Sequence, residues 1–125
     1  MHSPPKEIVF INGFFLPADE AIALIKNRII CFSRAIHKTL KVVNGVVECF
    51  EPHLRLFYEQ CSSASLYPPL ITKKWIQKLI SYNGAKRGHW KLNLIVTKDS
   101  PLEEKGPPKL FSHFAITIKP LKTAS

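Results

Sequence analysis

The sequence predicts an α+β domain: a small domain with an antiparallel sheet, two early hairpins and two helices. Asn12-Gly13 and Asn44-Gly45 each lie between extended apolar runs. This is the strongest short-range indication of a β-hairpin, because both residue types tolerate positive φ. Helical periodicity follows in the middle of the chain, and two segments of alternating hydrophobicity come after it. Strands kept apart from helices in this order favour an antiparallel sheet over a parallel one.

The first hairpin is expected to pair residues 7–11 with residues 14–16. Pro17 should end its second strand, because proline cannot donate a hydrogen bond to a sheet ladder. Residues 18–26 fit either a short helical turn or an extended segment, and residues 28–32 are expected to be extended. The second hairpin is expected to pair residues 39–43 with residues 46–50, which are rich in β-branched side chains.

A first helix is expected from about Pro52, because proline is well placed in the first turn of a helix. Its apolar face should consist of residues at helical spacing, namely Leu54, Phe57, Cys61 and Ala64. A second helix is expected to begin after Thr72 as N-cap and to end at Asn83-Gly84. Its apolar stripe should comprise Ile76, Leu79 and Ile80.

The last two strands are expected over residues 90–97 and 111–119, where apolar residues alternate with polar ones. On one face of the first we expect Leu92, Leu94 and Val96, and on one face of the second Phe114, Ile116 and Ile118. A loop containing proline, glycine and charged residues joins them over residues 100–108.

The composition predicts one soluble globular domain, since 46% of the 125 residues are apolar and 22% are charged. We expect the domain to span residues 7–121, with a disordered start over 1–6 and a tail over 122–125. No apolar run approaches the roughly 18 residues of a membrane-spanning helix. Residues 1–6 lack the apolar core of a signal peptide, so a cytoplasmic location is expected.

A metal or redox site is not expected. Cys31, Cys49 and Cys61 are widely spaced and form no Cys-x-x-Cys pair, so buried, reduced thiols are the favoured interpretation. No two histidines lie at i, i+4 spacing, and none lies beside a cysteine in a ligand pattern.

The net charge of +9 leaves two interpretations open. A basic stretch could bind RNA or another polyanion through its phosphates, or it could be a solvated face, which we favour because no recognition motif accompanies it. Trp75 and Trp90 are expected to serve the core rather than to stack on bases. The stretch comprises Lys73, Lys74, Lys78, Lys86, Arg87, Lys91 and Lys98.

Several motifs together resemble one enzyme family. An Asn-Gly hairpin is followed by Asn27-Arg28, and a second hairpin leads directly into His53-Leu54-Arg55-Leu56 at a helix start. A later strand ends in Ile95-Val96-Thr97-Lys98. Over about residues 8–120 this order is similar to the smaller, N-terminal domain of class IV aminotransferases. These fold-type IV pyridoxal-phosphate enzymes include branched-chain aminotransferase, D-amino acid aminotransferase and aminodeoxychorismate lyase.

The resemblance implies pyridoxal phosphate as cofactor and Arg55 as the candidate contact to its phosphate. It places His37 on the substrate side and Lys98 near the mouth of the site. Residues 33–38 replace the family's Gly-Asp-Gly-x-Phe-Glu segment, so its permissive glycines and carboxylates are absent. An ungapped match puts Leu56 at the phosphate-binding arginine position, and Arg55, one residue earlier, lies about 100° away around the helix.

The family's cofactor lysine lies beyond the region that this chain matches, and Lys122 comes too early to take its place. The resemblance therefore implies no catalytic residue in this chain, no covalent cofactor link and no activity alone, as transferase or as lyase. A missing C-terminal domain or a homodimer partner would complete the enzyme, whose substrate would be an amino acid or a chorismate derivative. The alternative is a non-catalytic module that binds RNA, another polyanion or a protein.

Overall fold

A computed structural model describes residues 7–21, 36–98 and 112–121 of the chain. The expectations for residues 1–6, 28–32, 100–108 and 122–125 lie outside these described residues.

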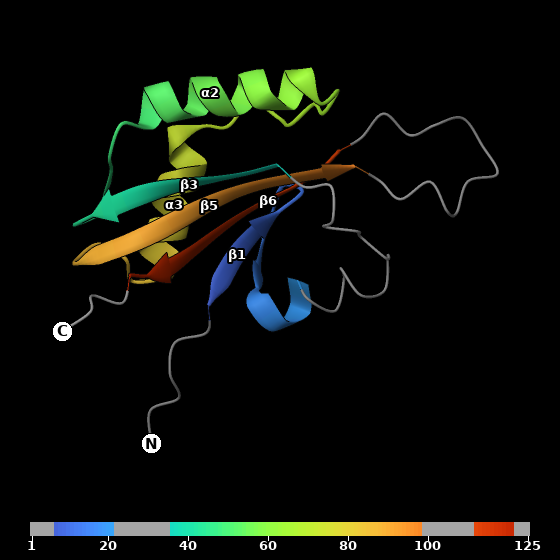
Figure 1. The fold of residues 1–125 in the computed structure, drawn as a ribbon. Helices are drawn as coiled ribbons and strands as arrows, with labels where there is room; N and C mark the ends of the chain where they lie inside the picture. Colours follow the sequence, from blue (N-terminus) through green and yellow to red (C-terminus); the bar gives the residue numbers. More distant parts are fainter. Residues whose placement is uncertain (1–6, 22–35, 99–111, 122–125) are drawn as a thin grey trace.

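The described strands form one six-stranded sheet in which each strand pairs antiparallel with its neighbours, in the order β2-β1-β6-β5-β3-β4 (Figure 1). Hairpin connections link β1 to β2 and β3 to β4. The expected α+β class with an antiparallel sheet is confirmed. The strands are β1 (Ile8–Ile11), β2 (Phe14–Pro17), β3 (Ile36–Val43), β4 (Val46–Val47), β5 (His89–Lys98) and β6 (Ser112–Pro120).

Both Asn-Gly turns are present. Asn12 and Gly13 have φ of 49° and 97°, and Asn44 and Gly45 have φ of 48° and 80°. These values match the left-handed conformation that a tight hairpin turn requires at both central positions. Pro17 closes β2 as its last residue, and residues 18–21 are helical, which agrees with one of the two alternatives left open for that segment.

The expected strand over residues 46–50 is wrong in its second half. β4 ends at Val47, and helix α2 (Phe50–Ser63) already begins at Phe50. The turn is made at Cys49, which adopts a left-handed conformation with φ 52° and directs the chain from the sheet into the helix. Pro52 lies in the first turn of α2, as expected.

Helix α2 packs on the sheet through Leu54, Phe57 and Cys61, which are buried. The expectation that Ala64 continues this face is wrong. Ala64 is the exposed C-cap residue, because the helix ends at Ser63. Leu66 takes the buried place instead, with its backbone N–H donating to the carbonyl of Cys61 at 2.8 Å.

Helix α3 (Lys73–Tyr82) begins and ends where the sequence predicts. The Thr72 hydroxyl accepts a hydrogen bond from the Trp75 backbone N–H at 3.2 Å, as an N-cap does. At the other end Gly84 has φ 66°, in the left-handed region that favours glycine after a helix. The expected apolar stripe is buried in full and consists of Ile76, Leu79 and Ile80.

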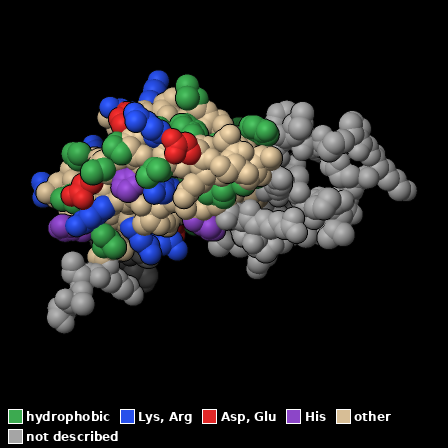
Figure 2. Space-filling view, turned by 45° about the horizontal axis from the view of Figure 1, so that its top comes forward, with side chains coloured by type: hydrophobic (Ala, Val, Ile, Leu, Met, Phe, Trp, Pro, Cys, Tyr) green, Lys and Arg blue, Asp and Glu red, His purple; other side chains and the backbone are tan. Residues whose placement is uncertain are grey.

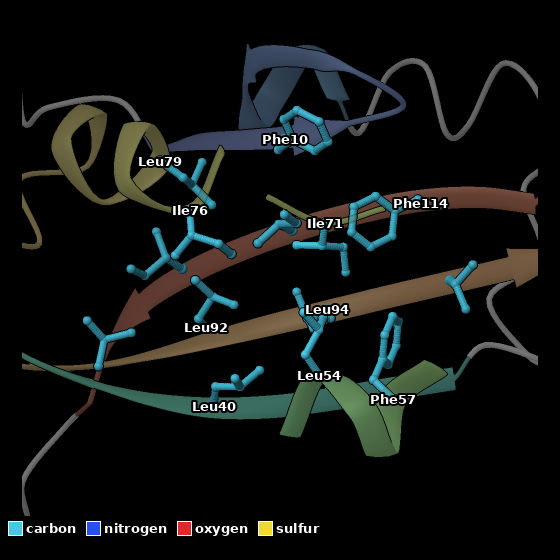
Figure 3. Packing of buried hydrophobic residues seen from close by; sticks show 14 of the residues in the cluster. Phe10, Leu40, Leu54, Phe57, Ile71, Ile76, Leu79, Leu92, Leu94 and Phe114 are labelled. Carbon is cyan, nitrogen blue, oxygen red and sulfur yellow. The ribbon is translucent and has the colours of Figure 1, made fainter. Parts of the chain in front are cut away.

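Helices α2 and α3 lie against the same face of the sheet, and the main core lies between these two helices and the sheet (Figure 3). Leu92, Leu94 and Val96 of β5 point into this core beside Phe114, Ile116 and Ile118 of β6, as expected. The tryptophans also serve the core: Trp75 stacks on Phe10 with ring centroids 4.7 Å apart, and Trp90 packs against the cluster.

The expectation of buried thiols holds for Cys61 and is wrong for Cys49, which is exposed at the start of α2; Cys31 lies outside the described residues. Within residues 7–21, 36–98 and 112–121, no group of His, Cys, Asp or Glu could hold a metal ion. In the same part of the chain, no helix has the length and apolar character needed to cross a membrane.

Candidate functional site

Arg55 lies on the outer side of α2. The register that buries Leu54 and Phe57 turns the two residues between them to solvent, so Arg55 and Leu56 are both exposed. Leu56 keeps 48% of its surface accessible, which is large for a leucine on an amphipathic helix. Both side chains, Arg55 and Leu56, therefore lie on the side of α2 that faces away from the sheet, where solvent or a ligand can reach them.

His37 is exposed on β3, on the sheet face opposite α2 and α3. We call this the open face, although the helical residues 18–21 pack on part of it against Val9 and Ile11. Ile36, the neighbour of His37 in the chain, packs against the main core, so alternation along the strand places His37 on the opposite face. Arg55 and His37 therefore belong to different layers of the domain. Among the described residues, no hydrogen bond or ion pair joins the side chain of either to another residue.

The other two predicted positions lie at or beyond the described part of the chain. The backbone of Lys98 forms the end of β5, opposite Ser112 of β6. Its side chain lies outside the described residues, as does Lys122. Residues 33–35 of the segment that replaces the family's glycine-rich stretch are also outside them.

The described residues do not by themselves fit pyridoxal phosphate. Leucine at position 56 offers no hydrogen-bond donor to a phosphate, whereas a guanidinium there would offer a planar, bidentate pair. Arg55 is exposed and has no second phosphate donor fixed beside it among the described hydrogen bonds. A cofactor held here would need groups from another domain.

β3 lies near one end of the sheet, and only part of its outer edge pairs with the short strand β4. β3 pairs with β5 from Ile36 to Val43, but with β4 only at Val42 and Val43. Beyond these pairs, the Lys41 carbonyl accepts from the Glu48 backbone N–H at 2.9 Å. Residues 36–40 therefore have an outer edge without a strand partner among the described residues, and α2 packs alongside this strand.

A pocket of about 240 Å³ opens between the second hairpin and α3. Its lining is mainly apolar, with Lys73 and Gln77 as polar members. Lys73 lies 3.8 Å from the Glu51 carboxylate, and both side chains are largely exposed. None of the predicted site residues lines this pocket, whose apolar members are Val46, Val47, Phe50, Ile76 and Ile80.

The basic stretch between residues 73 and 98 does not form one surface. Lys73, Lys74 and Lys78 belong to α3 on one side of the sheet, whereas Lys91 lies on the open face on the other side. Figure 2 shows Lys and Arg side chains at separate places on the visible face, with acidic and hydrophobic side chains between them. Proximity in sequence was misleading because the chain crosses from one layer to the other.

A different group of lysines does come together. Lys41 of β3, Lys91 of β5 and Lys119 of β6 are direct cross-strand neighbours on the open face, and all are exposed. They are far apart in sequence, so no local pattern reveals them. Alternation alone places each on the polar side of its strand, and the pairing register aligns them.

No protein-family model matches the sequence, and no curated protein matches it. Solved structures do match its fold. A branched-chain aminotransferase from Thermoproteus uzoniensis superimposes with a TM-score of 0.66 at 15% identity, over 94% of this chain and 41% of that protein. A mutant of the Thermobaculum terrenum enzyme gives 0.66 at 16% identity, over 97% and 41%. The Escherichia coli enzyme gives 0.68 at 11%, over 93% and 41%.

The chain has the fold of the N-terminal domain of class IV aminotransferases. The expected resemblance is confirmed at the level of fold, and it extends over nearly the whole chain. The chain spans only about two fifths of the length of these solved aminotransferases. The Thermoproteus uzoniensis enzyme has been crystallised with norvaline, and another matched branched-chain aminotransferase with pyridoxamine 5'-phosphate.

Proposed function

We propose that this chain acts as the N-terminal domain of a class IV aminotransferase-like pyridoxal-phosphate protein and requires a second domain for activity. The observation that carries the proposal is the extent of the fold match, which includes 94% of this chain but 41% of the matched aminotransferase. The remaining part of such a protein would complete the cofactor site. A C-terminal domain or a second subunit could supply it.

This chain would contribute a surface that the second domain or subunit contacts. The outer edge of β3 and the exposed positions 55 and 56 of α2 lie outside the main core. Arg55 would meet the cofactor phosphate only if contact with a second domain fixed its side chain, and a guanidinium is well suited to that role. His37 and Lys98 remain proposals for the substrate side.

Pyridoxal phosphate, when bound, supplies the electron sink for transamination or elimination at an amino acid. The described residues contain no amine that is fixed beside a phosphate site, so this chain alone should not use the cofactor catalytically. We propose an amino acid as substrate of the complete protein, on the basis of the norvaline complex of a protein with the same fold. We further propose a cytoplasmic location.

A transamination assay tests the proposal. The purified chain is incubated with pyridoxal phosphate, norvaline and an oxo acid, beside an identical reaction without protein. The expected rate equals that of the free cofactor. Norvaline consumption well above the cofactor-only reaction would show that the chain needs no second domain. Arg55→Ala is the matched variant, and calorimetry measures phosphate binding as a second readout. The unmodified isolated chain and its Arg55→Ala variant should bind phosphate equally.

A further inference from the structure

The open face of the sheet carries a row of three lysines. In the sheet register Lys41 stands opposite Lys91, and Lys91 stands opposite Lys119. Their neighbours Leu40 and Leu92 are buried in the core beneath the helices. The lysines therefore point from the other face, where they are exposed.

This arrangement places like charges where cross-strand pairing disfavours them. Residues directly opposite one another in an antiparallel sheet have Cβ atoms only about 4.5–5.5 Å apart, and like charges there are destabilising. Among the described residues, no acidic side chain forms an ion pair with any of the three lysines. Glu48 follows β4 beside Lys41, so one carboxylate borders the row at its outer end, and Lys91 and Lys119 lie farther from it.

A polar row lies next to the lysines on the same face. It consists of Thr39, Asn93 and Thr117, which are also paired across the three strands. The Thr39 hydroxyl donates to the Asn93 side-chain oxygen at 2.6 Å, which leaves the amide nitrogen of Asn93 as a donor. The aromatic residues of the same strands, Trp90 and Phe114, pack toward the core instead.

These features together suit a flexible chain of phosphates. The row crosses two strand spacings, about 10 Å, so successive phosphates of one strand can follow it. Lysine, threonine and asparagine side chains are common donors to phosphate oxygens. Binding to an anionic membrane would also use an exposed apolar flank that inserts among the lipids. Both rows here are polar, and Val9 and Ile11, which lie on the same face, are buried in a second cluster with Ala21.

We propose that this face binds the phosphate backbone of a single-stranded nucleic acid through Lys41, Lys91 and Lys119. The bound phosphates offset the mutual repulsion of the three ammonium groups. The two rows themselves contain no aromatic stacking platform, so binding along them is indifferent to base sequence and strongly dependent on salt. The inference rests on the sheet register and is independent of the proposed aminotransferase-like role.

The test is the salt dependence of binding to a labelled oligothymidine of about 12 nucleotides, followed by fluorescence anisotropy. Three phosphate contacts predict a slope of log K against log[salt] near −2, at about −0.7 per contact for a single strand. The double variant K91Q/K119Q should reduce the magnitude of this slope by about 1.4. The conservative variant K91R/K119R should keep it.

The matched control is K74Q/K78Q, which removes the same charge from exposed positions of α3 on the other side of the sheet. It should leave the slope unchanged. Equal effects of the two double variants would overturn the proposal, since net charge alone would then explain binding. Absence of binding at about 50 mM salt would overturn it as well. So would stronger binding to phosphatidylserine vesicles or to polyglutamate than to the oligonucleotide. Circular dichroism of each variant shows whether the fold is retained.

Discussion

Asn83, at the C-cap of α3, holds both backbone polar groups of Ile8 at the start of β1. Its side-chain oxygen accepts from the Ile8 N–H at 2.9 Å, and its amide nitrogen donates to the Ile8 carbonyl at 2.9 Å. The same nitrogen also donates to the carbonyl of Leu79 at 2.8 Å. One amide thus completes the end of a helix and joins it to a strand 75 residues away in sequence.

Asn83→Ala should lower the free energy of unfolding by about 1–3 kcal/mol, because it leaves the Ile8 N–H and carbonyl without their partners. Asn93→Ala is the matched control. Its side chain takes part in one exposed hydrogen bond with Thr39, so the loss should stay below about 1 kcal/mol. Urea unfolding of both variants checks this, and a larger effect at Asn93 would contradict the assigned role of Asn83.

Phe57→Ala should lower the free energy of unfolding by about 3–5 kcal/mol, because Phe57 is fully buried between α2 and the sheet. Arg55→Ala, two residues away on the exposed side of α2, should cost less than about 1 kcal/mol. The same unfolding measurements apply. If Arg55 proves the more damaging change, its side chain serves the fold rather than being free for a second domain.

The two described cysteines should react very differently with a thiol reagent. Burial raises the pKa of the Cys61 thiol to about 11, and the side chain has no accessible surface. Cys49 is exposed. At about pH 8 we expect iodoacetamide to modify Cys49 in the native protein and to modify Cys61 only after unfolding. Peptide mass spectrometry distinguishes the two, and prompt modification of native Cys61 would contradict its burial.

Stability should fall at alkaline pH. The pKa of Cys61 rises from an ordinary 9.0 to about 11 through burial, and burial also raises the pKa of Tyr58, although the hydrogen bond from the Ile71 backbone opposes this. A raised pKa means that the folded state keeps its proton more tightly. The resulting stability is complete below about pH 9 and is lost as pH rises through about 11.

Urea unfolding across this range measures the effect, and Cys61→Ala provides the control. The variant should start from a lower stability, because it leaves a cavity, but its stability should decline less steeply with pH. An identical decline in both proteins would show that Cys61 does not contribute.

Local sequence patterns predicted most of the fold. The Asn-Gly turns, the Thr72 N-cap and the apolar faces of α2 and α3 each follow from neighbouring residues, so they are visible without the structure. The errors came at junctions. The sequence around Cys49 reads as a continuing strand because valines precede it, whereas the chain turns there through a left-handed residue. Ala64 fits the helical period but falls after the helix end.

Less of the candidate site could be predicted. Arg55 lies one residue before the family's arginine position and His37 lies in the segment that replaces the family's glycine-rich stretch. The structure places these two candidates in different layers, a separation that the motif comparison did not predict. The row formed by Lys41, Lys91 and Lys119 depends on the register of three strands that are distant in sequence. Such a register is set by tertiary pairing, so the row became visible only in the fold.

The most direct test of the central claim is borohydride trapping of the isolated chain with pyridoxal phosphate, followed by mass spectrometry of the intact protein and its peptides. A chain that needs a second domain to hold the cofactor should show only sparse modification, scattered over many lysines. The 125-residue chain should therefore give no stoichiometric adduct at any one site. A single adduct per chain on one lysine, Lys122 above all, would contradict the account.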